Sequence, residues 1–158
     1  MRQQRTQAGD RPQVPWDSES LFYALARVTT LDGYRAARRL FTFVETCGAQ
    51  FTFPIGTHAQ VNVWLPIRGT RTHVLSMYDT GKHGSVSFDF GFIRHSASDQ
   101  AITTFARRLR TTPAVAKSLL RLQRPGDDLH PSVHFDAVVD PSALDVIEAA
   151  IDELLATA

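Results

Sequence analysis

The side chains best suited to metal chemistry lie together near the end of the chain. Asp127, Asp128, His130, His134 and Asp136 offer carboxylate and imidazole groups, which suit a divalent ion. In a strand, His130, His134 and Asp136 share one face. Ligands at i and i+4 of a strand are about 13 Å apart, however, which is too far for one ion. We therefore expect no metal ion and no other cofactor.

The sequence lacks the motifs that mark familiar classes of enzyme. A restriction-type nuclease needs an acid two residues before a lysine, but Lys82 and Lys117 follow Thr80 and Val115 at that spacing. The sequence contains no HExxH, Walker, GxSxG or GxGxxG motif. Cys47 is predicted near the C-terminus of a helix, where the dipole raises the pKa of a thiol and makes it a poor nucleophile.

The strongest functional signal is positive charge. No acid lies between Asp99 and Asp127, whereas Lys117, Arg121 and Arg124 stand at i, i+4 and i+7 and would line one helix face. Such a stripe could contact successive phosphates of DNA or RNA. The predicted phosphate-contacting residues are Arg35, Arg39, Arg107, Arg108, Lys117, Arg121 and Arg124. Trp64 is predicted to offer a stacking surface to a base.

Negative charge is concentrated at the other end. All seventeen Lys and Arg residues lie in residues 1–126 together with eight acids, and residues 127–158 carry the other eight acids. The leading interpretation is a non-catalytic nucleic-acid-binding or accessory module. One alternative is that the basic stripe pairs with the acidic last helix inside the fold. Another is that this helix, residues 141–156, binds a protein partner or a second copy of the chain.

A third hypothesis is a small enzyme with an unfamiliar site on the polar face of the sheet. Asn62, Trp64, Ser87 and Asp89 occupy polar positions of two predicted strands. A deep pocket there, with Asp89 buried and its pKa raised, would favour this hypothesis.

The chain has the length of one domain. Its 158 residues, 43% of them hydrophobic, can bury one core. Residues 1–15 are polar and basic and predict a flexible arm, so the domain is expected at residues 16–158. The sequence shows neither a long apolar run nor a signal peptide. A single cysteine fits a reducing cytoplasm.

Periodicity predicts the elements that carry these residues. Alternating apolar residues predict strands at residues 60–67 and 85–93, with further strands at 51–55, 73–78 and 131–139. Helices are predicted after caps at Asp17 or Ser18, Thr30, Ser98 or Asp99, Thr112 and Asp140. The predicted fold class is α+β: an antiparallel sheet of four or five strands, centred on a meander, with helices packed mainly on one face.

The order of several short motifs resembles a known family. These are Trp16 followed by Phe22, and the segments at residues 36–40 (AARRL), 84–88 (GSVSF), 91–94 (GFIR), 131–135 (PSVHF) and 140–144 (DPSAL). They resemble a poorly characterised bacterial domain that occurs alone or attached to restriction-endonuclease-like and DNA-defence proteins. The resemblance covers roughly residues 16–156 and implies a DNA-related setting.

Overall fold

A five-stranded antiparallel sheet with the strand order β1-β2-β3-β4-β5 forms the centre of the fold. The computed structural model describes residues 15–120 and 130–157. The strands are β1 (Gln50–Thr52), β2 (Gln60–Ile67), β3 (Thr70–Asp79), β4 (Gly84–Phe88) and β5 (Ser132–His134). Each strand pairs with its neighbour in sequence, although helices separate β4 from β5. The predicted α+β class and the central meander are confirmed.

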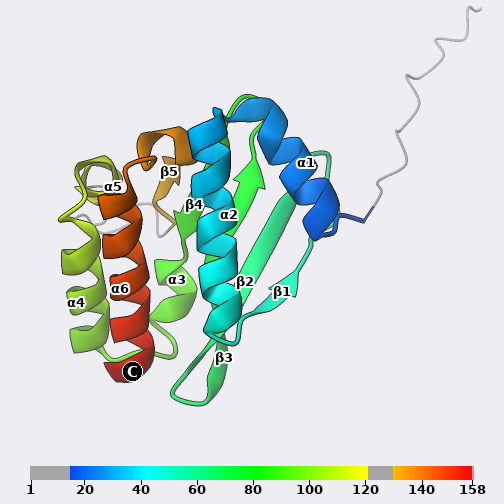
Figure 1. Cartoon of the computed structure of the whole chain (residues 1–158). Helices are drawn as coiled ribbons and strands as arrows, with labels where there is room; N and C mark the ends of the chain where they lie inside the picture. Colours follow the sequence, from blue (N-terminus) through cyan, green and yellow to red (C-terminus); the bar gives the residue numbers. More distant parts are fainter. Residues whose placement is uncertain (1–14, 121–129, 158) are drawn as a thin grey trace, which may run out of the picture.

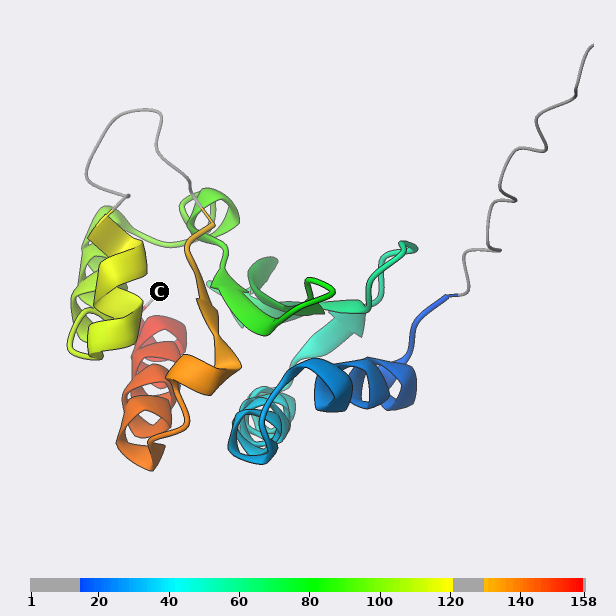
Figure 2. The same ribbon diagram turned by 90° about the horizontal axis from the view of Figure 1, so that it is seen from above.

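The helices flank this sheet. They are α1 (Ser18–Val28), α2 (Leu31–Thr46), α3 (Phe90–Ile93), α4 (Asp99–Leu109), α5 (Pro113–Leu119), the 3-10 turn η2 (Phe135–Ala137) and α6 (Pro141–Thr157). Helices α4, α6, α2 and α1 follow one another across Figure 1. Turned by 90°, Figure 2 shows α1 and α2 on one side of the sheet.

Helices α1, α2 and α4 begin where a side chain satisfies free backbone N–H groups, whereas the predicted cap Thr112 makes no such hydrogen bond before α5. Asp17 accepts a hydrogen bond from the backbone of Ser20 at the start of α1. Thr30 and Ser98 cap α2 and α4 in the same way. After α2, Gly48 adopts a φ of 79°, a conformation that glycine tolerates best. These predicted starts and the predicted end of α2 are confirmed.

One face of the sheet carries the core. Val61 and Val63 of β2 pair with Met77 and Leu75 of β3, and all four side chains are fully buried. Helix α2 adds a buried stripe of Ala36, Ala37, Leu40, Phe41 and Val44, at the spacing of one helix face. The opposite face of the sheet is therefore the polar one.

Three predicted strands are shorter than expected. The strand predicted at residues 51–55 ends at Thr52. The strand predicted at residues 85–93 ends at Phe88, because Asp89 (φ −97°, ψ 67°) leaves the strand conformation and opens α3. The alternation of Phe88, Phe90 and Phe92 had predicted that the strand continues to residue 93. Phe90 instead packs against Phe105 of α4, and Phe92 contacts His73 on the polar face. The strand predicted at residues 131–139 ends at His134 and continues into η2.

One predicted segment falls almost entirely outside the residues that the structure describes. The predicted arm, residues 1–15, lies outside the described residues except for Pro15. Within the described ranges, every helix is too short or too polar to cross a lipid bilayer.

Candidate functional site

The polar face of the sheet is organised in rows that cross neighbouring strands. Asn62, Ser76 and Ser87 form one row through β2, β3 and β4. Gln60 and Tyr78 begin the next row. Side chains in directly opposite positions of antiparallel strands lie about 5 Å apart. Polar groups from three strands therefore meet on this side, away from α1 and α2.

A β-bulge brings one more residue into this group. The register between β2 and β3 shifts after Val63, so that Trp64 pairs with His73 and not with Val74. In a regular strand, residues at i and i+3 point to opposite faces. The extra residue of the bulge reverses this relation, and His73 consequently lies on the same face as Ser76.

Asp89 reaches the site from the end of β4. Its backbone N–H donates to the carbonyl oxygen of Val74 in the bulge, at 2.8 Å. The carboxylate, only 6% exposed, lies between two imidazoles. Its Oδ2 is 3.0 Å from His73 Nδ1, and its Oδ1 is 2.6 Å from His130 Nδ1. Oδ1 makes no hydrogen bond within the described residues despite this close contact, and the carboxylate is held between the two rings.

The His73 ring is fixed on several sides. It stacks on Trp64 with the centroids 5.2 Å apart and contacts the Phe92 ring at 5.4 Å. Its Nδ1 faces Asp89, and its Nε2 lies 2.8 Å from Ser76 Oγ. Both ring nitrogens are thus engaged, and the imidazole has little freedom to rotate.

A chain of hydrogen bonds continues from the imidazole across the sheet. Ser76 Oγ donates to Asn62 Oδ1 at 2.9 Å, and the same oxygen accepts from Gln60 Nε2 at 2.8 Å. The direction of the bond between Ser76 Oγ and His73 Nε2 depends on the tautomer of the imidazole, and Ser76 accepts when Nε2 carries the hydrogen. Turning the hydroxyl hydrogen toward a neutral His73 Nε2 reverses the direction of that bond without moving a heavy atom. The arrangement can therefore hold a proton at either atom.

These residues line a pocket of about 440 Å³. Its walls are Gln60, Asn62, Trp64, His73, Ser76, Tyr78, Ser87, Asp89, Phe92 and His130. The volume lies within the range of small-molecule sites, which combine apolar walls with a few convergent polar groups. We call it the sheet-face pocket.

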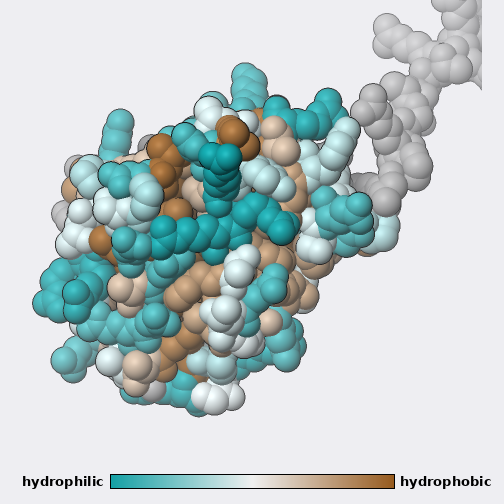
Figure 3. Space-filling model, in the orientation of Figure 1, coloured by the Kyte–Doolittle hydropathy of each residue, from teal (hydrophilic) through white to brown (hydrophobic). Residues whose placement is uncertain are grey.

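Two of the predicted phosphate-contacting residues are paired with acids of α6. Arg39 binds Glu148 and Asp145 of α6, and Arg108 binds Glu153 of the same helix. The acidic last helix thus neutralises two arginines from elsewhere in the domain, although neither belongs to the predicted stripe, of which the structure describes only Lys117. Figure 3 shows hydrophilic side chains running across the face where α2 and α6 lie side by side.

The other residues predicted to bind nucleic acid have different surroundings. Arg35 pairs with Asp32 at the exposed surface of α2. Arg107 and Lys117 are exposed, whereas Arg121 and Arg124 lie outside the described residues. Trp64 is half-buried in the sheet-face pocket, stacked on His73, with its Nε1–H donated to Thr52 Oγ1. Because that ring face and the N–H are occupied, Trp64 has less surface to offer a base.

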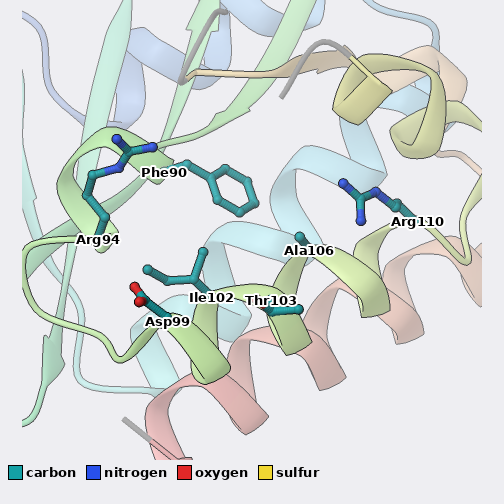
Figure 4. A pocket seen from close by; sticks show the side chains of 7 residues that line it. All are labelled: Phe90, Arg94, Asp99, Ile102, Thr103, Ala106 and Arg110. Atoms are coloured by element: carbon teal, nitrogen blue, oxygen red, sulfur yellow. The ribbon is translucent and has the colours of Figure 1, made fainter. Parts of the chain in front are cut away.

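A second pocket lies between α3 and α4 and has a volume of about 530 Å³. Figure 4 shows Arg94 and Arg110 at its two ends, with the Phe90 ring and Ile102 between them. Asp99 lies near the Arg94 end. The pocket combines two cations and the Asp99 carboxylate with an apolar floor, and its lining contains no histidine, cysteine or serine.

The candidate metal ligands are dispersed. His130 faces Asp89, the His134 ring stacks on His83 at 4.1 Å, and Asp136 accepts hydrogen bonds from Thr30. Asp127 and Asp128 lie outside the described residues. Among the residues that the structure does describe, no group of three or more His, Cys, Asp or Glu could hold a metal ion.

Cys47 is poorly suited to nucleophilic chemistry. Burial raises the pKa of its thiol, and the charge of Asp152 raises it further. The predicted direction is confirmed, although burial, not the helix dipole, is the main cause.

Sequence reasoning singled out Asn62, Trp64, Ser87 and Asp89 on this face but missed His73 and Ser76. The two stand three residues apart in β3, and a regular strand would separate them. No sequence signal marks the bulge. Comparison with protein-family models, with curated proteins and with solved structures gave no match.

Proposed function

We propose that the domain binds a small polar molecule in the sheet-face pocket. The observation that carries this proposal is the buried chain of polar groups from Asp89 through His73 to Ser76 on the pocket wall. Burying a carboxylate and an imidazole is costly unless both are paired. Titratable groups buried beside a specific charge partner in a concave site are candidates for a functional role.

The lining indicates the kind of ligand. Asp89 and the imidazoles favour a partner with hydrogen-bonding groups, and the Asn62 amide and the Ser87 hydroxyl add neutral polar contacts. Trp64 and Phe92 supply apolar surface beside them. A small molecule with a polar head and a short apolar part fits this combination.

The NMR signals of the tryptophan side chains provide a direct test, since the chain contains only two tryptophans. Trp64 lines the pocket, whereas the indole N–H of Trp16 donates to Gly56, so Trp16 serves as an internal reference. A panel of small amides, hydroxy acids, imidazoles and esters would be titrated into ¹⁵N-labelled protein. We expect at least one compound to move the Trp64 signal and leave Trp16 unchanged.

Substitutions make the test specific. Asn62→Leu removes a polar wall group and should abolish the shift, whereas Arg110→Gln, in the pocket between α3 and α4, should leave it intact. If no compound moves Trp64, or if Asn62→Leu binds equally well, the proposal is wrong.

Nucleic-acid binding in a cytoplasmic, DNA-related setting is our second candidate. It is favoured by the exposed cations Arg107, Arg110 and Lys117 on α4, α5 and the link between them. None has an ion pair within the described residues, in contrast to Arg39 and Arg108. These three cations would make phosphate contacts whose strength falls steeply with added salt.

Fluorescence anisotropy with labelled DNA and RNA at 50 and 200 mM NaCl tests this candidate. Replacing Arg107, Arg110 and Lys117 together by Gln should weaken binding and reduce the slope of log K against log [salt] by up to about 2.7. Arg35→Gln is the matched control and should change little. An affinity that does not depend on salt, or that the triple substitution leaves unchanged, would contradict nucleic-acid binding by these cations.

Protein association through the acidic last helix receives less support. Asp145, Glu148 and Glu153 of α6 already bind arginines of the same domain, so fewer of its charges remain for a partner.

A further inference from the structure

We infer that Ser76 is a nucleophile for acyl transfer, with His73 as its base and Asp89 as the residue that positions the base. This inference rests on the proposed function of the sheet-face pocket, because the substrate must bind there. The pocket would take a small ester or another activated acyl compound.

The first support is the order and spacing of the atoms. Ser76 Oγ lies 2.8 Å from His73 Nε2, and His73 Nδ1 lies 3.0 Å from Asp89 Oδ2. A nucleophilic hydroxyl needs a base within about 2.6–3.2 Å, and the base needs a third group that fixes its orientation. Serine–histidine–aspartate relays with these roles arise on unrelated folds and in different chain orders, so geometry identifies them.

The second support is rigidity. The His73 ring is held by Trp64 and Phe92 on its flanks, and the backbone N–H of Asp89 is bonded to the bulge that carries His73. A base held at hydrogen-bond distance needs little rearrangement during proton transfer. Ser76 is only 5% exposed but lines the pocket, which restricts attack to a carbonyl group placed at the pocket floor.

The reaction follows from these positions. Ser76 Oγ forms a bond to the carbonyl carbon of the ester, and its proton passes to His73 Nε2. The bond from that carbon to the alkoxide oxygen then breaks, and His73 gives the proton to the departing oxygen. Asp89 remains ionised and stabilises the imidazolium. While the carbon is attacked, the electron pair of the C=O π bond moves to the carbonyl oxygen, and Ser87, opposite Ser76 on β4, would donate its hydroxyl hydrogen to that oxygen.

Water completes the cycle. His73 removes a proton from a water molecule whose oxygen bonds to the acyl carbon. The bond between that carbon and Ser76 Oγ breaks, and the proton on His73 returns to the serine. The products are a carboxylic acid and the free enzyme, and no oxidant or metal ion takes part.

An alkyl fluorophosphonate is a suitable probe, because Ser76 Oγ would bond to phosphorus, fluoride would leave, and the hydroxyl proton would pass to His73. The adduct would be located by mass spectrometry of tryptic peptides. The peptide of residues 72–82 contains Ser76 as its only serine, so a labelled peptide identifies the site. We expect a single adduct there.

Variants test the role of each residue. Ser76→Ala should remove the adduct, and His73→Gln and Asp89→Asn should each slow labelling at least about 100-fold. Ser85→Ala, a serine on the same sheet face but outside the pocket, is the control and should label at the wild-type rate. For Asp89→Asn, a long-range ¹H–¹⁵N spectrum of His73 should also show the proton moved from Nδ1 to Nε2, a change that loss of packing alone would not cause.

The outcomes separate this inference from the proposed function. If small molecules move the Trp64 signal but the wild-type protein gains no adduct on residues 72–82, acyl transfer is wrong and binding stands. If labelling proceeds equally fast in a folded His73→Gln variant, the relay is wrong. If neither binding nor labelling occurs, both proposals fail.

Discussion

The contact between α2 and α6 allows a quantitative prediction of stability. Arg39 holds Glu148 with two parallel hydrogen bonds, Nε to Oε1 at 3.0 Å and Nη2 to Oε2 at 2.8 Å. It also binds Asp145 and the carbonyl oxygen of Pro141. Side-chain exposure is 36% for Arg39, 18% for Glu148 and 69% for Asp145. The pair with Glu148 should therefore contribute far more than the pair with Asp145.

The magnitude follows from geometry and screening. A charged hydrogen bond contributes about 1.5–3 kcal/mol when it is well shielded, and solvent at Arg39 reduces this value. We expect Glu148→Gln to lower the free energy of unfolding by about 1–2 kcal/mol and Asp145→Asn by less than about 0.5 kcal/mol. In a domain of this size the first change corresponds to a fall in Tm of about 3–6 °C.

The pH dependence of this contribution has a definite sign. The hydrogen bonds to Glu148 and Asp145 raise the pKa of Arg39 above its already high ordinary value. A raised pKa means that the stabilisation is complete below the ordinary value and is lost only as the pH rises through the folded value. Arg39 should therefore stay protonated between about pH 5 and pH 10, and its contribution to stability should not change across this range.

The assay is a double-mutant cycle with Arg39→Met and Glu148→Gln, followed by urea unfolding. Arg35→Met is the control, since its partner Asp32 is highly exposed, and it should change stability by less than about 0.5 kcal/mol. In 1 M NaCl the Asp145 contribution should vanish while most of the Glu148 contribution remains. A coupling energy below about 0.3 kcal/mol, or an equal loss for Asp145→Asn, would refute the reasoning.

Three further predictions concern single positions. Gly33→Ala should destabilise the fold by about 1–3 kcal/mol, because a Cβ there would collide with the Asp136 carboxylate, whereas Gly56→Ala meets no close neighbour and should be tolerated; urea unfolding compares them. Cys47 should react with iodoacetamide near neutral pH more slowly than free cysteine, because its pKa is raised, and urea should remove the difference. Hydrogen bonds from Ser20 lower the pKa of Asp17, so Asp17→Ala should reduce Tm at neutral pH, and the gap should close as the pH falls through the lowered value; a gap that persists in acid contradicts this.

The elements that local chemistry determines were predictable. Helix starts follow from Asp17, Thr30 and Ser98, whose side chains satisfy backbone groups within three residues. The bounds of β2 follow from alternation between apolar and polar residues. Neither inference needs knowledge of a distant part of the chain, so both survive the assembly of the fold.

Contacts between distant residues were only partly predictable. The division of charge along the sequence indicated that the acidic last helix could neutralise basic residues, and Arg39 and Arg108 do pair with it. Which arginines pair depends on how α2 and α4 pack against α6, and composition cannot give that. The sequence therefore predicted the same phosphate-contacting role for Arg107 and Arg108, whereas Arg108 faces Glu153 and Arg107 is exposed.

In the candidate site, a register shift of one residue was likewise not predictable from the sequence. Period-two alternation assigns His73 and Ser76 to opposite faces of β3, and only the register shift after Val63 brings them together. That shift is held by the end of β4, where Asp89 binds the bulge through its backbone and His73 through its carboxylate. One residue thus fixes both the geometry of the strand and the orientation of the base. A bulge that served twist alone would not need a buried carboxylate beside it, and this coincidence is the reason to look for chemistry on the polar face of the sheet.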